Sequence, residues 1–364
     1  MTYLLLLATV IFLSYSNGAN DNFKGVATLY SCGALDYRKA IWTATITTFA
    51  GSICSLLLAD QLIANFSGQG LVSAEVTAQP DFLIAVSLGA AATVMAATLR
   101  GLPISTTHSL IGALTGAGLM AVGSNLNLPV LANKFLLPLL FSPIVAILMV
   151  VFIIRSAYRI DSWLSLDGNA GESSFICIGI VKLLTYPSGF NFWLPVFKVT
   201  TSGNALPNQI ACINVASVMQ AGHLISGSLV SFARGLNDTP KLVALLVGVR
   251  AHETEWGMLL VAAFIALGGL FNASKVARTM SKKITSISQQ QGFVSNGVTA
   301  FLVICASRLG MPVSTTHVSV GSLFGVGLLS NKTDYGVIRK ILLSWLITLP
   351  TAAAVAALVY LAVH

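Results

Sequence analysis

The feature that most constrains this chain is a series of long apolar runs with almost no charge inside them. Only 9 % of its 364 residues are charged and 55 % are hydrophobic, whereas about 25 % of an ordinary soluble domain is charged. The sequence therefore predicts an all-α integral membrane protein that crosses the bilayer several times. The runs lie at about 2–17, 22–33, 40–60, 82–99, 104–121 and 131–154, and again at about 208–233, 240–249, 256–271, 292–307, 312–329 and 337–361.

The two halves of the chain repeat each other. The segment GANDNFK at 18–24 returns in the second half as GLNDTPK at 235–241. The segment GLPISTTH at 101–108 returns there as GMPVSTTH at 310–317. Two different motifs that recur in the same order at nearly the same separation indicate an internal duplication.

Each repeat is predicted to contain a first helix broken at its Asn-Asp step, a plain crossing, a helical hairpin and a last crossing. This gives three crossings per half, or five if the hairpin legs also span the bilayer. Because both numbers are odd, the second repeat must have the inverted topology of the first. The boundaries that follow are membrane repeat 1 at 1–155, a central cytoplasmic loop at 156–206, and membrane repeat 2 at 207–364.

Positive charge gives the orientation of these segments. Thirteen lysines and arginines fall on one side of the predicted bilayer, and only Lys134 and Arg250 fall on the other. Cytoplasmic loops carry the excess of lysine and arginine. We therefore expect a multi-pass protein of the cell membrane, with its central loop in the cytoplasm and both termini outside.

Asp21 and Asp238 are the only acidic residues deep inside apolar runs. A carboxylate in that position costs roughly 3 kcal/mol unless something compensates it. With the amides of Asn20 and Asn237 and the carbonyls freed by a broken helix, the two carboxylates are predicted to hold a hard cation such as Na⁺. The alternative is a structural ion pair of each aspartate with the lysine three residues later.

The repeated Ser-Thr-Thr-His segments are predicted to restart a helix at the tip of each hairpin. Proline ends the incoming leg, and a serine or threonine caps the outgoing one. A helix N-terminus with hydroxyls beside it forms an anion site, and inversion brings the two tips together at the midplane. The alternative is that these hydroxyls bond to their own helix carbonyls. The predicted anion ligands are Ser105, Thr106, Thr107, Ser314, Thr315 and Thr316.

Several other polar residues near the motifs have no assigned role. They are His108, His317, Gln220, Arg100, Arg234 and Arg308. The sequence contains no serine-nucleophile elbow, zinc signature or P-loop beside the motifs. The chain is therefore not expected to be an enzyme, and no resident cofactor is expected.

The duplicated Gly-x-Asn-Asp and Pro-x-Ser-Thr-Thr-His elements resemble the repeat signatures of the PiT family of inorganic phosphate transporters, over essentially the whole chain. The resemblance implies that the hairpin hydroxyls hold phosphate and that both aspartates are essential. The chain differs from the commoner family pattern at 22–25 and 239–242, and it has Arg234 where the family often has histidine.

These observations predict a secondary symporter that imports inorganic phosphate with Na⁺ by alternating access. A doubly charged phosphate and two ionised aspartates would bring four negative charges together, which favours coupling to a cation. H⁺ coupling, sulfate as the anion, and a non-transporting phosphate receptor stay open. The expected partners are phosphate, Na⁺ and the lipid bilayer, with no nucleic acid; a homodimer stays open.

Overall fold

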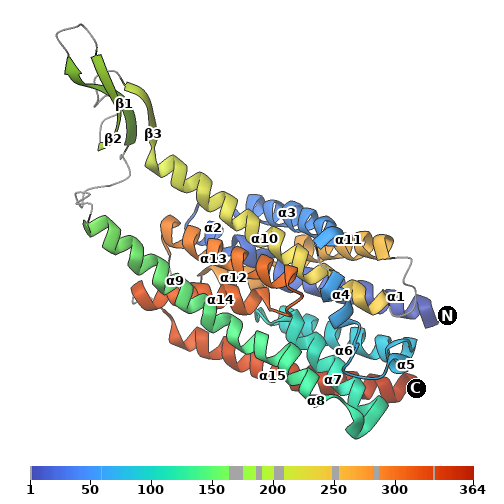
Figure 1. Ribbon diagram of the computed structural model, residues 1–364. Helices are drawn as coiled ribbons and strands as arrows, with labels where there is room; N and C mark the ends of the chain where they lie inside the picture. The colour runs from blue at the N-terminus through green and yellow to red at the C-terminus, as the bar shows by residue number, and fades with distance from the viewer. Residues whose placement is uncertain are drawn as a thin grey trace.

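The computed structural model describes residues 2–58, 60–163, 175–185, 191–200, 209–247, 254–282, 287–330 and 333–364. Figure 1 shows long helices lying side by side, with a small sheet projecting from one end. Within these ranges, seven helical segments are long and apolar enough to cross a membrane. The chain is therefore a helical multi-pass membrane protein, as its composition predicted. The segments are Thr2–Ser31, Tyr37–Leu58, Pro80–Leu99, Leu128–Ala157, Val215–Val247, Glu255–Asn272 and Tyr335–Val363.

The first helical path is interrupted at its motif, as predicted. Helix α1 (Thr2–Asp21) ends there, the 3₁₀ segment η1 (Asn22–Val26) follows, and α2 (Ala27–Ser31) resumes the path. The other elements of this half are α3 (Tyr37–Leu58), α4 (Asp60–Phe66), α5 (Ala74–Thr77), α6 (Pro80–Leu99), α7 (Thr106–Val122), η2 (Gly123–Asn125), α8 (Leu128–Val130), the π-helical η3 (Leu131–Leu136) and α9 (Leu137–Trp163).

The second half does not repeat this break. Helix α10 (Val215–Val247) passes through the second motif as one continuous helix, so the prediction of a broken helix here is wrong. Pro240 lies inside α10, and transmembrane helices tolerate an internal proline when neighbouring groups satisfy the freed backbone carbonyl. The elements that follow are α11 (Thr254–Asn272), α12 (Ser274–Lys282), α13 (Gln289–Arg308), α14 (Thr315–Ser330) and α15 (Tyr335–Val363).

The two halves are interlocked by reciprocal contacts. Helix α1 packs on α11, and its counterpart α10 packs on α3. The second hairpin legs do the same, since α7 packs on α15 and α14 on α9. Helices α1 and α10 run in opposite directions along the bundle (Figure 1). Each half therefore completes the packing of the other.

Close packing between the halves depends on glycine at matched positions. Gly18 lies so close to the carbonyl of Ile265 that a Cβ there would overlap it, and Gly235 lies equally close to the carbonyl of Thr48. Gly235 is the repeat counterpart of Gly18, and Ile265 stands at the same offset from Thr48. The contact between first helix and second crossing is thus made twice with the same register.

The chain forms an antiparallel three-stranded sheet between α9 and α10, with the strand order β2-β1-β3. Its strands are β1 (Phe175–Thr185), β2 (Asn191–Thr200) and β3 (Gln209–Asn214). Phe175 is in register with Thr200 on one side and with Asn214 on the other. Cys212 of β3 is disulfide-bonded. The sequence predicted a loop at 156–206; α9 continues past the start of that range, and β3 begins after its end.

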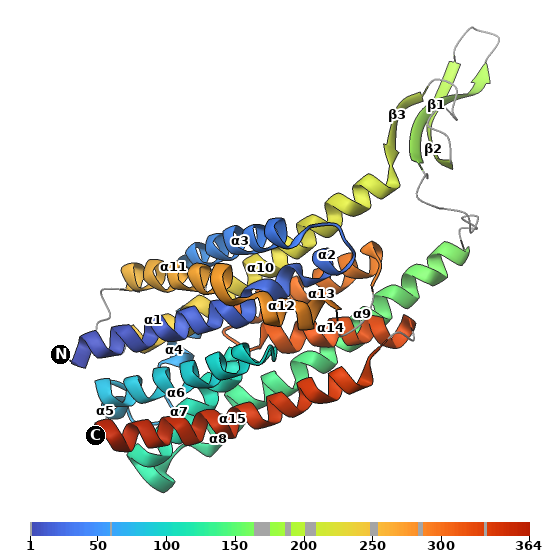
Figure 2. The same ribbon diagram turned by 180° about the vertical axis from the view of Figure 1, so that it is seen from behind.

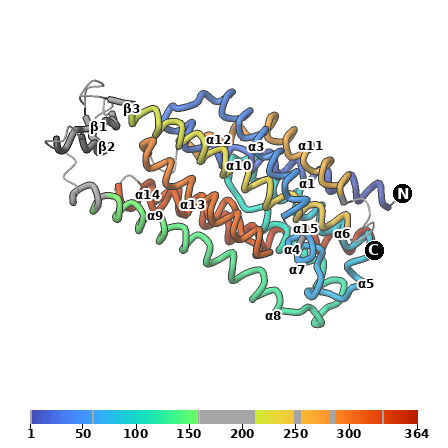
Figure 3. Tube along the Cα trace, turned by 45° about the horizontal axis from the view of Figure 1, so that its top comes forward, coloured from blue at the N-terminus to red at the C-terminus, as the bar shows by residue number. Residues whose placement is uncertain are grey.

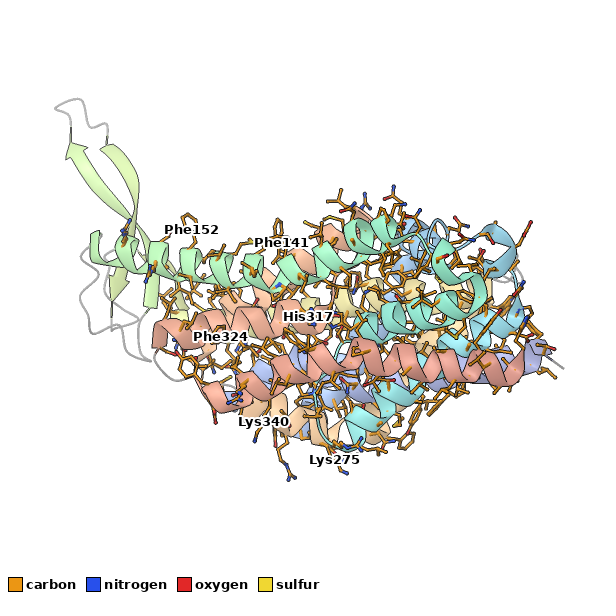
Figure 4. All side chains as sticks on the ribbon, turned by 90° about the horizontal axis from the view of Figure 1, so that it is seen from below. Phe141, Phe152, Lys275, His317, Phe324 and Lys340 are labelled. Carbon is orange, nitrogen blue, oxygen red and sulfur yellow. The ribbon has the colours of Figure 1, made fainter. Side chains whose placement is uncertain are left out.

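The two ends of the bundle differ. Both termini lie at the end opposite to the sheet, as Figure 2 shows from behind. Helix α9 runs along one side of the bundle between these ends (Figure 3). Its Phe141 and Phe152 point outward in Figure 4 and are 56 % and 72 % exposed. An exposed apolar stripe of this kind is typical of a surface that faces lipid.

Candidate functional site

The two hairpin tips restart their helices as predicted. Ser105 is the N-cap of α7, and its hydroxyl accepts a hydrogen bond from the backbone N–H of His108 at 3.1 Å. Ser314 accepts the equivalent bond from His317 at 3.3 Å. The two serine hydroxyls therefore cap their own helices, as the predicted helix restart requires. Their predicted role as anion ligands stays a prediction. Both tips turn on a glycine with positive φ, Gly101 and Gly310.

The threonine hydroxyls reach beyond their own helices. Thr106 donates to a carboxylate oxygen of Asp21 at 3.0 Å. Thr316 donates across the repeats to the carbonyl oxygen of Ile104 at 3.0 Å, and Thr107 donates to that of Val313 at 3.4 Å. Both tips are thus joined to each other, as predicted. Thr315 is buried beside them.

Two matched sets of side chains lie against these tips. The first half-site consists of Asn17, Asn20, Asp21 and Lys24, and the second half-site consists of Arg234, Asn237, Asp238 and Lys241. Each member of the second set follows its counterpart by the offset that relates Asp238 to Asp21, and all eight side chains are buried.

In the first half-site, Asp21 is held by one ammonium group and two neutral donors. Lys24 forms an ion pair with it. The amide of Asn17 donates to the other carboxylate oxygen at 3.2 Å, beside the hydroxyl of Thr106. The structural ion pair that the sequence left as an alternative is therefore present.

In the second half-site, Asp238 faces two cations at longer range. The Nζ of Lys241 lies 3.5 Å from one carboxylate oxygen, and the Nε of Arg234 lies 3.6 Å from the other. The amide of Asn237 donates to Asp238 at 3.1 Å. This carboxylate is therefore balanced by a pair of looser contacts.

Asn17 and Arg234 connect the two half-sites. A guanidinium nitrogen of Arg234 donates to the side-chain oxygen of Asn17 at 2.9 Å. The Nδ2 of Asn17 lies 3.2 Å from a carboxylate oxygen of Asp21 and 3.3 Å from one of Asp238. The two carboxylates thus share one amide between them.

Each lysine reaches the hairpin tips of both repeats. The Nζ of Lys24 donates to the carbonyl of Ile104 at 2.7 Å and to the hydroxyl of Thr316 at 2.5 Å. The Nζ of Lys241 makes the matching pair of contacts, to the carbonyl of Val313 at 2.8 Å and to the hydroxyl of Thr107 at 2.9 Å. The ammonium groups therefore lie among the predicted anion ligands.

Asn20 and Asn237 each connect their half-site to the hairpin of the same repeat. Asn20 donates to the hydroxyl of Thr98 at 2.8 Å and accepts from the ammonium of Lys24 at 3.0 Å. Asn237 accepts from the hydroxyl of Ser307 at 3.2 Å and donates to the carbonyl of Val313 at 3.2 Å. Their predicted role as Na⁺ ligands stays a prediction.

The structure divides the six polar residues that had no assigned role into those near the site and those exposed at the surface. Arg234 is part of the site, whereas the side chains of Arg100, Arg308 and Gln220 are exposed. His108 and His317 pack edge to face behind the tips, with ring centroids 4.5 Å apart. The ring of His317 also packs against that of Trp345, with centroids 3.8 Å apart and the planes tilted by 36°. His317 lies in the interior of the bundle (Figure 4).

Sequence reasoning missed part of this site. Lys24 and Lys241 were considered only as ion-pair partners, and Asn17 was not considered. The signal was the repeat itself, because its alignment places Asn17 opposite Arg234 and the two lysines opposite each other. Extending the alignment to the residues before each Gly-x-Asn-Asp motif would have found the Asn17–Arg234 pair.

The sequence matches a family model described as the phosphate transporter family over residues 17–356. It is 26 % identical to a putative phosphate permease of Pyrococcus abyssi, covering 98 % of this chain and 96 % of the relative. It is 28 % identical to a probable low-affinity inorganic phosphate transporter of Rhizobium meliloti, covering 98 % and 95 %. A solved structure described as the sodium-dependent phosphate transporter matches with a TM-score of 0.78 at 23 % identity, covering 99 % of this chain and 98 % of the other. That likeness concerns the fold.

Proposed function

The chain belongs to the phosphate transporter family, and we propose that it is a secondary transporter that imports inorganic phosphate at the paired hairpin tips. The observation that carries the proposal is the meeting of two helix N-termini and two lysine ammonium groups inside a membrane-spanning bundle. Thr107, Thr316, Lys24 and Lys241 are linked in one buried cluster. Its relatives are described as phosphate permeases and phosphate transporters, which agrees with this chemistry.

A tetrahedral oxyanion suits this arrangement. The start of a helix directs N–H groups and the positive end of its dipole at a ligand, and α7 and α14 both begin in the cluster. Hydrogen bonds from ammonium groups to an anion are stronger than neutral ones. Backbone, hydroxyl and ammonium donors thus converge from two sides, which favours an anion with oxygens pointing in all directions.

Alternating access between inverted repeats is the proposed transport mechanism. The reciprocal packing of α1 on α11 and of α10 on α3 supports it, as do the opposite directions of α1 and α10 (Figure 1). All of the charged residues in the two half-sites are at most 3 % exposed. Since the cluster is closed toward both ends, phosphate enters only when one repeat moves against the other.

The coupling ion was predicted to be Na⁺ at Asn20, Asp21, Asn237 and Asp238, with H⁺ as the alternative. The ammonium groups of Lys24 and Lys241 contact the same two carboxylates. These contacts compete with Na⁺ for its predicted ligands, so they favour transport that does not use Na⁺. The proposed transport step therefore does not include Na⁺.

Sidedness is proposed from charge, with the sheet in the cytoplasm and both termini outside. The disulfide of Cys212 is an opposing observation, because disulfides are rare in cytosolic segments. A cysteine introduced at Gln220, near the sheet end of α10, decides between them. Impermeant thiol reagents should label it only when they reach the cytoplasmic face; labelling from outside would reverse the proposed orientation.

Uptake of labelled phosphate into proteoliposomes containing the purified protein tests the transport function. The account predicts saturable uptake that excess unlabelled phosphate abolishes. A variant with both Thr107→Val and Thr316→Val serves as control, because it keeps the side-chain shapes and removes two hydroxyls. Uptake that sulfate suppresses more strongly than phosphate would make sulfate the substrate. Phosphate binding without any uptake would favour a receptor.

A further inference from the structure

We propose that Lys24 and Lys241 are tethered cations that take the place of a coupling Na⁺ at Asp21 and Asp238, so that this chain moves phosphate without sodium. The inference rests on the proposed transport function and specifies its ionic requirement. Its evidence is the position of the two ammonium groups, their charge, and their repetition in both halves.

The first argument is the position of the lysine ammonium group. The oxygens around the Nζ of Lys24 are a carboxylate of Asp21, the amide oxygen of Asn20, the carbonyl of Ile104 and the hydroxyl of Thr316. These are the oxygen types expected to coordinate a hard cation. The donor set thus fits a cation, and the ammonium group already fills that role. A Na⁺ ion placed among the same oxygens would lie against a positive charge.

The charge of the cluster gives the second argument. Asp21 and Asp238 contribute two formal negative charges, and three cations balance them. All five residues are buried, from 1 % exposed for Lys241 to 3 % for Asp238. The cluster is therefore positive by one charge before any ligand binds. A singly charged phosphate would make it neutral, and a doubly charged one would leave a single negative charge beside two helix N-termini. No additional cation is needed to compensate the anion.

The repetition is the third argument. A lysine that only neutralised its aspartate would need one contact, to a neighbour three residues away. Each lysine here also bonds to a carbonyl of its own hairpin tip and to a threonine of the opposite one. The two lysines occupy equivalent positions of the first repeated motif, and Thr107 and Thr316 occupy equivalent positions of the second. Cross-repeat contacts that occur twice place both cations where the proposed anion binds.

Replacing Na⁺ tests the inference directly. Initial rates of labelled phosphate uptake into proteoliposomes should agree within about twofold in sodium, potassium and choline salts of matched ionic strength. A fall of tenfold or more in the uptake rate without Na⁺ would overturn the proposal that the lysines replace Na⁺, but it would not contradict the transport function. If there is no uptake in any salt, the transport function fails instead. Calorimetry with inorganic phosphate then decides the inference: equal affinities in sodium and choline support it, and sodium-dependent or absent binding overturns it.

Lysine variants give a second test with the same assays. Lys24→Met leaves Asp21 without its cation, so uptake or phosphate binding should fall at least tenfold in choline, and Na⁺ should recover part of the loss. The double variant Asp21→Asn with Lys24→Met removes both charges and should not respond to Na⁺. Lys39→Met, at an exposed position paired with Asp36, is the matched control and should behave as the parent. A folded Lys24→Met protein that keeps parental phosphate affinity without Na⁺ would overturn the proposal, and Lys241→Met repeats the test.

Discussion

The two half-sites are built from the same parts, yet they differ in how each aspartate is balanced. Asp21 pairs with one lysine, so the first half-site is neutral in formal charge. Asp238 faces Lys241 and Arg234, so the second half-site carries one positive charge more. This difference comes from a single unmatched position, where the first repeat has Asn17 and the second has Arg234. The repeats keep the same residue types at the other three positions of each half-site, and this one difference sets the charge of the whole cluster.

The backbone differs at the same place. The first helix breaks into a 3₁₀ segment after Asp21, whereas α10 continues through Asp238. Lys24 lies on the broken segment and Lys241 on the continuous helix, but both ammonium groups reach equivalent tip atoms. The long, flexible lysine side chain absorbs the difference between the two backbones. Matched side-chain chemistry therefore does not require matched helices.

The largest expected effect comes from breaking the buried ion pairs. Asp21→Asn leaves Lys24 buried without a counter-charge and should lower the free energy of unfolding by about 3–5 kcal/mol. Removing an uncompensated buried carboxylate would relieve a desolvation cost, but the ion pair with Lys24 reverses the sign of the effect. Adding Lys24→Met should restore most of the stability, because both charges are then absent.

The second half-site should respond differently to the same pair of changes. Asp238→Asn with Lys241→Met still leaves Arg234 without a carboxylate, so stability should recover only in part. Denaturant titration of the purified proteins in mixed micelles measures both double variants and the single variants Asp21→Asn and Asp238→Asn. Equal recovery in both double variants would show that Arg234 does not depend on Asp238, and the proposed difference between the half-sites would be wrong.

Exchanging the unmatched position tests the origin of the extra charge. Arg234→Asn makes the half-sites alike and neutral, and phosphate affinity should fall by about 2–5 kcal/mol, roughly 30- to 4,000-fold. The double variant Asn17→Arg with Arg234→Asn moves the charge to the other repeat and should regain most of the affinity. Calorimetry with phosphate measures the affinity of both variants. Parental affinity in Arg234→Asn would show that the arginine does not contribute to phosphate binding.

The threonines that meet the lysines should have smaller and nearly equal effects. Thr107→Val and Thr316→Val each remove one hydroxyl that bonds to an ammonium group. Phosphate affinity should fall by about 1.5–3 kcal/mol, roughly 10- to 150-fold, in each. The same calorimetric titration compares them. Losses under about 1 kcal/mol at both positions would mean that these hydroxyls serve only the packing of the tips.

The capping serines should have the smallest effect, and it should concern stability. Ser105→Ala and Ser314→Ala each remove an N-cap and should cost about 1 kcal/mol of the free energy of unfolding. Because their hydroxyls already bond to their own helices, phosphate affinity should change less than in the threonine variants. Thermal unfolding and calorimetry on the same samples check both parts. If the free energy of phosphate binding falls by more than the free energy of unfolding, the serine hydroxyls bind the anion directly.

Much of this arrangement could be predicted from sequence because the repeat carries it. Two matched motifs located both hairpin tips and both aspartates, and the proline and serine at each tip correctly predicted a helix restart. The first helix breaks where expected. These features depend on local chemistry, which the residues themselves display.

The parts that could not be predicted depend on long-range packing. Pro240 favours a break, yet α10 stays helical because it is buried against α3 and α13. Strands β1 and β2 lie in the polar stretch that was expected to be a loop, and β3 lies at the start of the segment that was expected to be membrane repeat 2. Lys24 and Lys241 pair with aspartates three residues away, but their contacts to the opposite repeat depend on how the halves interlock, which residue spacing does not show.

The central claim is that one oxyanion binds between the two hairpin tips. Crystals grown with arsenate, a tetrahedral analogue of phosphate, test it through the anomalous signal of arsenic. The account predicts one strong peak between the N-termini of α7 and α14, within hydrogen-bonding distance of the Nζ atoms of Lys24 and Lys241. A peak elsewhere in the bundle, with none between the tips, would contradict the account.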